Sequence, residues 1–207
     1  MSKTQFPPSI KSRPVYGELE ARPGSGHLMI ADAEGAEAIL DLAKSLAKSG
    51  AKDFWAKAHI IYIPKATGTK YSSQLEELGA GKFYAGPSYE AAQSRIRRAL
   101  QDCHMGTQVY LSGTESLMGQ AMAEATAAGI PHTAIQTEHR GSTARRMQCV
   151  HCKGITEDVT TDPFECSHCG LSLFVRDHYS RRLAAFQGVR VDAEDPGNIP
   201  EKVELFK

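Results

Sequence analysis

The stretch HLMIADAEGAEAILDLAKSLAKSG, residues 27–50, decides the fold class of this chain. Its first five residues form a short apolar run, which predicts a buried strand. From Ala36 to Ser49 the apolar residues instead recur every three to four positions, as they do on one face of a helix. The stretch therefore predicts one β–α unit.

The same alternation continues to about residue 140. Further strands are predicted at HIIYI (59–63), KFYA (82–85), QVYLS (108–112) and TAIQT (133–137), and further helices at 88–101 and 115–128. Continuous apolar strands separated by helices are typical of a parallel sheet that is covered on both faces. We therefore predict an α/β domain with about five parallel strands.

Composition limits the classes of partner and the location. The chain has 207 residues, with 24 Lys plus Arg and 24 Asp plus Glu, so no net field recruits nucleic acid or an anionic membrane. We expect neither as a partner. No apolar run of a secretory signal and no apolar span of about 18 residues occurs, so we expect a cytoplasmic protein.

Changes in composition also set the expected domains. Residues 1–26 are expected to form an extended N-terminal arm, residues 27–146 the α/β domain, and residues 147–207 a metal-binding domain with a C-terminal tail. Within the last domain, LSLFV (171–175) predicts a strand and residues 179–186 predict a short helix.

Four of the five cysteines, Cys149, Cys152, Cys166 and Cys169, have the spacing C-x2-C-x13-C-x2-C. Two such motifs supply four thiolates to a closed tetrahedral metal site. Zn²⁺ and a single iron both suit four thiolates, so a structural zinc-ribbon site and a rubredoxin-like iron site remain open. The polar segment between the motifs favours zinc. A two-iron cluster is disfavoured because its plant-type spacing is different.

The other reactive residue types have a simpler interpretation. Cys103 is expected to be a buried or incidental cysteine and not a reactive thiol. His151 and His168, at the third position of each motif, are expected to point away from the metal. Two groups of basic residues are expected on solvated faces or in partner contacts: Arg95, Arg97 and Arg98, and Arg140, Arg145, Arg146 and Lys153.

Three segments, in this order, resemble the nucleotide-binding half of ferredoxin–NADP reductase-like enzymes, especially the oxygenase reductases that end in a plant-type iron–sulfur domain. Residues 27–50 resemble the first strand, phosphate turn and first helix. QVYLSGTESLM (108–118) resembles the late strand and turn written Y-x-C-G-P-x-x-L-M, and AAGIPHTAIQTE (127–138) resembles the final strand, which ends in Glu138. The resemblance implies a ferredoxin-reductase-like fold.

The phosphate turn departs from that family. It reads Asp32-Ala33-Glu34-Gly35-Ala36-Glu37, with three carboxylates where the family has glycines that let backbone N–H groups approach phosphate. A carboxylate about 4 Å from a phosphate charge costs about 4 kcal/mol at an effective dielectric near 20. In the late turn, Ser112 and Thr114 replace the family's cysteine and proline. We therefore expect a degenerate domain with no catalytic and no cofactor-binding residues.

The segment FVRDHYSRRLAAFQGVRVDAEDPG (174–197), together with the cysteines and the degenerate reductase fold, resembles the small subunit of bacterial dimethylamine monooxygenase. That family implies a haem-dependent complex that uses NADPH and O₂ to convert dimethylamine to methylamine and formaldehyde. It also implies a reductase partner with flavin and [2Fe–2S] and a catalytic partner with haem, so this chain is expected to be inactive alone. The first hypothesis is an accessory subunit that docks these partners. The alternatives are a rubredoxin-like electron relay and a free-standing NAD(P)H-dependent oxidoreductase.

Overall fold

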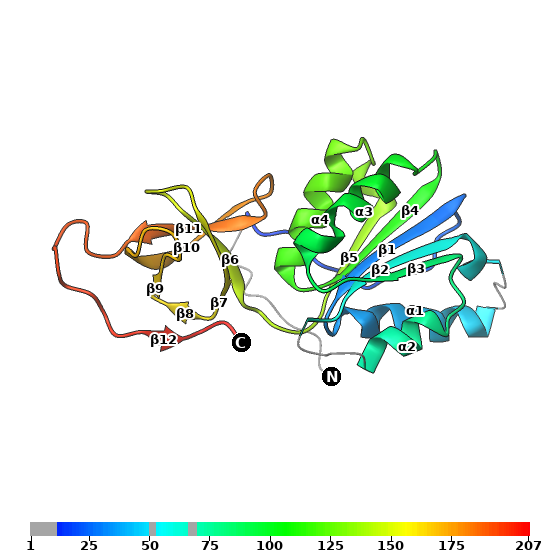
Figure 1. Ribbon diagram of the computed structural model, residues 1–207, viewed down its shortest axis with the longest axis horizontal. Helices are drawn as coiled ribbons and strands as arrows, with labels where there is room; N and C mark the ends of the chain where they lie inside the picture. The colour runs from blue at the N-terminus through cyan, green and yellow to red at the C-terminus, as the bar shows by residue number, and fades with distance from the viewer. Residues whose placement is uncertain (1–11, 50–52, 66–69) are drawn as a thin grey trace. The chain divides into compact units, whose positions relative to one another are not determined.

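The computed structural model describes residues 12–49, 53–65 and 70–207, in two compact units (Figure 1). The first unit is Tyr16–Gly141. The second is Ser142–Lys207 together with residues 12–15. None of the helices in these described ranges is both long and apolar enough to cross a membrane.

The first unit is built on a parallel sheet with the strand order β3-β2-β1-β4-β5. The strands are β1 (Gly26–Asp32), β2 (Ala58–Ile63), β3 (Lys82–Ala85), β4 (Thr107–Gly113) and β5 (Ile135–His139). This confirms the predicted α/β class and the five parallel strands. Strand β5 begins two residues later than predicted because His132–Ala134 form a 3₁₀ turn, η3.

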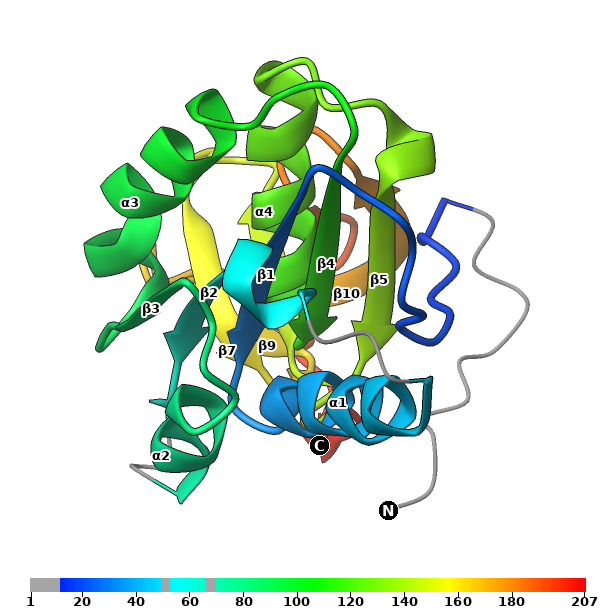
Figure 2. The same ribbon diagram turned by 90° about the vertical axis from the view of Figure 1, so that its right-hand side faces the viewer.

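Helices cover both faces of this sheet. They are α1 (Gly35–Ser49), α2 (Lys70–Glu76), α3 (Tyr89–Gln101) and α4 (Glu115–Ala127), with a 3₁₀ turn η1 at Trp55–Lys57. Helices α1 and α2 share one buried cluster with the sheet, and α3 and α4 share the other (Figure 2). Helix α2 was not predicted from the sequence.

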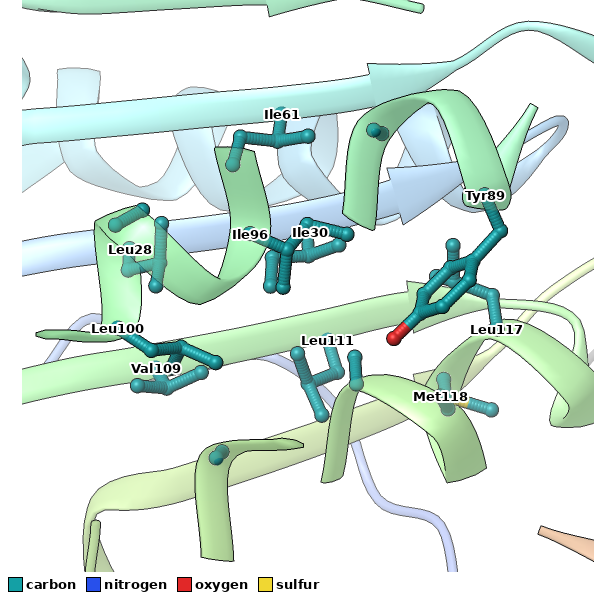
Figure 3. Packing of buried hydrophobic residues seen from close by; sticks show 14 of the residues in the cluster. Leu28, Ile30, Ile61, Tyr89, Ile96, Leu100, Val109, Leu111, Leu117 and Met118 are labelled. Atoms are coloured by element: carbon teal, nitrogen blue, oxygen red, sulfur yellow. The ribbon is translucent and has the colours of Figure 1, made fainter. Parts of the chain in front are cut away.

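Alternation along β1 explains the two clusters. Leu28 and Ile30 pack toward α3 and α4 (Figure 3), whereas Met29 and Ala31 pack toward α1. All four side chains are 3% exposed or less. A strand that is buried on both faces reads as a continuous apolar run, which is why the sequence identified it.

Local signals set the ends of α3 and α4. The Ser88 hydroxyl caps α3 by accepting from the Ala91 N–H at 3.2 Å. Helix α4 ends at Ala127, and Gly129, one residue past the C-cap Ala128, has a φ of +84° in the left-handed region. The next N–H, of Ile130, donates to the Ala125 carbonyl oxygen at 3.0 Å, so the last turn closes in a Schellman arrangement.

Residues 17–20 of the expected N-terminal arm lie along β5, and residues 1–11 of that arm lie outside the described ranges. The Gly17 N–H donates to the Thr137 carbonyl oxygen at 2.9 Å, and the Leu19 N–H donates to Glu138 Oε2 at 2.7 Å. Gln136 exchanges two side-chain hydrogen bonds with the Glu20 backbone. These bonds cover an otherwise open edge of the sheet.

The second unit is a five-stranded sheet in the order β7-β6-β11-β10-β9, with a two-stranded sheet of β8 and β12. Its strands are β6 (Arg145–Cys149), β7 (Ile155–Val159), β8 (Thr161–Asp162), β9 (Phe164–Glu165), β10 (Ser172–Ser180), β11 (Ala185–Arg190) and β12 (Val203–Glu204). The predicted helix over residues 179–186 is wrong. Tyr179 and Ser180 pair with Phe186 and Ala185 across an antiparallel hairpin, because burial of both aromatic rings favours strand pairing.

The core of this second unit is small. Met147, Phe164, Leu173 and Phe186 are among the few large apolar side chains in its buried cluster, which also includes Cys149 and Cys166. A sheet with so little apolar burial gains from a bound metal.

Candidate functional site

The four cysteines of the two Cys-x-x-Cys motifs converge in the second unit. One motif lies between β6 and β7 and the other between β9 and β10. All four Sγ atoms lie within 4.8 Å of one another, with 3.9 Å between Cys149 and Cys169 and 3.7 Å between Cys152 and Cys166. A regular tetrahedron with metal–sulfur bonds of about 2.3 Å separates its sulfur atoms by about 3.8 Å. The four cysteines are therefore placed to bind a metal ion.

Both motifs have the same backbone geometry. In each, the N–H of the first cysteine donates to the carbonyl five residues later, and its carbonyl accepts from the N–H four residues later. These bonds measure 2.9 and 2.9 Å at Cys149 and 2.9 and 3.0 Å at Cys166. The residue four positions after the cysteine is left-handed in both motifs, with φ of +64° at Lys153 and +70° at Gly170. Local turns thus preset the thiolate positions.

The charges of four adjacent thiolates require a cation. Burial alone would raise the pKa of Cys166, but the N–H groups of Cys169 and His168 and the neighbouring thiols lower it to about 6. The Leu171 N–H lowers the pKa of Cys169, but burial and the other three cysteines raise it to about 12. Without a cation, the cluster therefore holds only part of its possible negative charge at neutral pH. A divalent metal compensates the rest.

The two histidines inside the motifs lie away from the four sulfur atoms' shared centre. His168 Nε2 donates to the Ile155 carbonyl oxygen at 2.9 Å, and the imidazole ring packs on Gly154. A Cβ at Gly154 would lie 2.5 Å from that ring, so glycine is required there. His151 is exposed. The Gly154 N–H donates to Cys152 Sγ at 3.4 Å, as expected for a backbone that turns back toward sulfur.

A second cluster lies in the first unit, at the carboxyl ends of β1 and β4. The strand order reverses between these two neighbours, and α/β sheets bind ligands in the crevice at such a point. Here the crevice holds the carboxylate of Asp32, which is fully buried. It accepts from the Thr114 N–H at 2.7 Å and the Thr114 hydroxyl at 2.6 Å, and pairs with Lys65 Nζ at 2.8 Å.

Two residues of the late turn make this arrangement possible. Proline, which the reductase resemblance places at position 114, has no N–H and no hydroxyl, so only the departure to Thr114 supplies both donors. Gly113 has a φ of +121°, and a Cβ there would lie 1.9 Å from Asp32 Oδ1. The Ser112 hydroxyl donates to the Gly35 carbonyl oxygen at 2.9 Å, which fixes the start of α1 against β4.

The three carboxylates of the first turn have different environments. Asp32 alone occupies the crevice. Glu37 accepts from the Tyr71 hydroxyl at 2.5 Å and lies 3.9 Å from Arg140, whereas Glu34 lies beside Gly141. The expectation that these carboxylates stand in the place of phosphate stays a prediction, and of the three it is Asp32 that the late turn holds. Sequence patterns did not identify the lysine at position 65, because its pairing with Asp32 depends on tertiary structure.

Packing explains both Cys103 and His27, the histidine of β1. Cys103 is half-buried, its Sγ donates to the Ala99 carbonyl oxygen at 3.3 Å, and burial raises its pKa. His27 is buried and stacks on Phe54 with ring centroids 3.8 Å apart. Within the described ranges, the four motif cysteines are the one group of His, Cys, Asp or Glu side chains arranged to hold a metal ion.

The two groups of basic residues are mostly neutralised. Arg97 and Arg98 pair with Glu124 and Asp102. Arg145 pairs with Asp177, and Arg146 pairs with Glu157. Arg140 pairs with the Glu138 and Asp41 carboxylates. Arg95 lies over the Tyr84 ring, and Lys153 donates to the Val150 carbonyl oxygen. Neither group forms an unpaired basic patch.

Comparison with solved structures finds proteins of low sequence identity. Phthalate dioxygenase reductase, described as a modular structure for electron transfer from pyridine nucleotides to [2Fe–2S], is 11% identical with a TM-score of 0.45, over 66% of this chain and 44% of that one. A flavohemoglobin from Malassezia yamatoensis is 17% identical with a TM-score of 0.41, over 59% of this chain and 33% of that one.

Sequence comparison is more specific. A curated relative, the heme-dependent oxidative N-demethylase delta subunit of Ectopseudomonas mendocina (strain ymp), is 33% identical over 110 residues. That match covers 53% of this chain and 63% of the relative.

Two family models match in order along the chain. Residues 8–135 match the model described as dimethylamine monooxygenase subunit DmmA-like, N-terminal domain, and residues 146–189 match the corresponding C-terminal domain. The first match alone spans more than half of the chain. The chain therefore belongs to the family of DmmA-like dimethylamine monooxygenase subunits.

Proposed function

We propose that this chain is a non-catalytic accessory subunit of a cytoplasmic dimethylamine monooxygenase complex. In that complex, oxidative N-demethylation consumes NADPH and O₂ and converts dimethylamine to methylamine and formaldehyde. A reductase subunit with flavin and [2Fe–2S] and a catalytic subunit with haem carry the chemistry, and this chain docks them. Family membership and the named N-demethylase relative support the assignment.

One observation carries the non-catalytic role. The crevice where an α/β sheet of this order would take a nucleotide phosphate holds the protein's own carboxylate, Asp32, fixed by Thr114 and Lys65. Asp32 already accepts from the Thr114 N–H and hydroxyl, so neither donor is left for a phosphate. An unpaired carboxylate about 4 Å from a phosphate would cost about 4 kcal/mol at an effective dielectric near 20, and the Lys65 ammonium 2.8 Å from Asp32 reduces that cost here. The free-standing oxidoreductase alternative requires this site to accept a nucleotide.

The metal is proposed as zinc with a structural role. In that role Cys149, Cys152, Cys166 and Cys169 hold the ion, which joins two hairpins that share few buried apolar residues. Four free cysteines in a mutual cluster also fit the reducing cytoplasm.

An electron relay in the same complex is the second candidate. Cys152 is an exposed residue, so one edge of the site lies near the surface. A mononuclear iron bound by these thiolates would supply one-electron transfer, and the exposed edge would shorten the distance to a partner.

Metal analysis and reconstitution test these proposals. The accessory role predicts one zinc per chain, no visible absorption, no binding of NADPH by calorimetry, and loss of dimethylamine oxidation when this chain is omitted from the reconstituted complex. One iron per chain with a reversible visible bleach would support the relay instead. Micromolar NADPH affinity of the purified chain would contradict the interpretation of the Asp32 crevice.

A further inference from the structure

The hairpin of β10 and β11 carries three arginines whose guanidinium groups contact no other group in the described part of the chain. Arg176 lies on β10, and Arg181 and Arg182 lie in the turn that follows it. All three are exposed, as is His178 between them. No hydrogen bond, ion pair or ring contact to another described residue is made by these three guanidinium groups.

This arrangement is unusual within the chain. Every other arginine in the described ranges donates to a carboxylate or carbonyl or lies over an aromatic ring: Arg13, Arg22, Arg95, Arg97, Arg98, Arg140, Arg145, Arg146 and Arg190. The one carboxylate within the hairpin, of Asp177, is paired with Arg145 at 2.6 Å. No carboxylate within the hairpin remains to neutralise the three arginines.

The hairpin holds these groups on a fixed scaffold. Tyr179 and Phe186 pair across the two strands, with ring centroids 4.9 Å apart, and both side chains are buried. The Arg145 guanidinium lies 4.4 Å from the Phe186 ring centroid and further fixes the base of the turn. The arginines are therefore presented in place at little cost in backbone entropy on binding.

An aromatic side chain lies on the same face as Arg176. Phe174 is 39% exposed, whereas its neighbours on β10, Leu173 and Val175, pack into the unit's apolar cluster. Because side chains alternate along a strand, Phe174 and Arg176 share the outer face. Exposed aromatic residues beside arginines are enriched at protein interfaces.

We propose that Phe174, Arg176, Arg181 and Arg182, the basic hairpin face, dock an acidic surface of another subunit in the demethylase complex. The proposal rests on the proposed accessory function. Guanidinium groups pair with carboxylates in bidentate geometry, so an acidic protein surface matches both the charge and the form of the donors. The chain as a whole is neutral, with 24 basic and 24 acidic residues, which disfavours a polyanion such as nucleic acid as the occupant.

Association kinetics of the full chain with the purified remaining subunits test this inference. Arg181→Glu with Arg182→Glu should lower the association rate constant at least about tenfold at low ionic strength and weaken its dependence on salt. Phe174→Ala should instead raise the dissociation rate constant. The control, Arg98→Glu with Lys44→Glu, changes the net charge equally at exposed positions outside the hairpin and should leave both constants within about twofold.

The outcomes distinguish a failure of the proposed docking face from a failure of the proposed accessory function. If wild-type chain binds the subunits and the hairpin variant binds equally well, or the control variant slows association as much, the docking face is wrong while the accessory function stands. If wild-type chain binds no subunit, the accessory function fails, and the inference fails with it. Hairpin-dependent self-association in sedimentation, or hairpin-dependent binding to DNA in place of the subunits, would overturn the chosen occupant. Unchanged metal content and circular dichroism of each variant confirm folding.

Discussion

Replacing Asp32 by alanine tests the crevice directly. The carboxylate is fully buried, accepts from the N–H and hydroxyl of Thr114 at 2.7 and 2.6 Å, and pairs with Lys65 at 2.8 Å. Its removal leaves two buried Thr114 donors without this acceptor, at about 1–3 kcal/mol each. The lost ion pair adds less, because the Lys65 side chain is 35% exposed and its ammonium can be solvated. We expect the free energy of unfolding of the first unit to fall by about 3 kcal/mol.

Urea denaturation followed by tryptophan fluorescence measures this loss. The chain contains a single tryptophan, Trp55, which lies in the first unit and contacts Phe54 with ring centroids 5.2 Å apart. Its signal therefore reports unfolding of that unit. Asp41→Ala is the matched control, because it makes the same aspartate-to-alanine change at a half-exposed carboxylate that pairs with Lys44 and Arg140. There we expect the free energy of unfolding to fall by less than about 1 kcal/mol.

Comparing Asp32→Ala with Asp41→Ala shows whether the buried carboxylate stabilises the crevice. Asp32→Asn keeps the shape and an acceptor for the Thr114 N–H but loses the charge, so its loss should be intermediate. If Asp32→Ala costs no more than Asp41→Ala, the buried carboxylate does not fix the crevice, and the physical basis for excluding phosphate is wrong.

Three further predictions concern pH, the metal and the C-terminus. Burial lowers the pKa of both His27 and His59 from the usual 6.5, so below about pH 6.5 the unfolded chain binds protons that the folded chain does not. The first unit should therefore lose stability from pH 7 to 5, with His27 contributing at most about 1.4 kcal/mol per pH unit. His27→Gln should flatten that dependence in urea titrations, and an unchanged slope would contradict it. Cys149→Ser should abolish stoichiometric metal in elemental analysis while Cys103→Ser retains it; full metal content in the first variant would rule out the Cys₄ site. Phe206→Ala removes a ring 4.0 Å from the Arg145 guanidinium, so it should destabilise the second unit by about 1 kcal/mol and speed proteolysis of the C-terminus. Unchanged proteolysis would show that this contact does not hold the C-terminal segment.

Sequence reasoning succeeded where the signal was local. The apolar run of β1 and the periodicity of α1 lie within one stretch, residues 27–50, and predicted the β–α unit. Sequence reasoning failed where the pairing of strands decided the conformation. Residues 179–186 have a helix-compatible pattern, but Tyr179 and Phe186 bury their rings against each other across a hairpin. Helix α2 is short and was missed for lack of a long periodic segment.

The candidate sites divide in the same way. Two Cys-x-x-Cys motifs predict a metal site from sequence because each motif is a local turn that presets two thiolates, and the structure then brings the two pairs within 4.8 Å. The degenerate phosphate turn could also be identified from the sequence by its carboxylates. Its physical consequence could not, because the sequence assigns no partner to any of them.

By itself, the sequence determined the α/β class, the four cysteines that are placed to bind a metal ion and the family resemblance, all of which depend on the order and spacing of residues near one another in the chain. Only the tertiary structure decided that Asp32 fills the crevice, with donors from residues 65 and 114, and that Glu37 faces Tyr71 and Arg140 instead. It also separated the arginines that are neutralised from those on the basic hairpin face. The reason is that a charge acts according to what surrounds it within a few ångströms, and those neighbours come from distant parts of the chain.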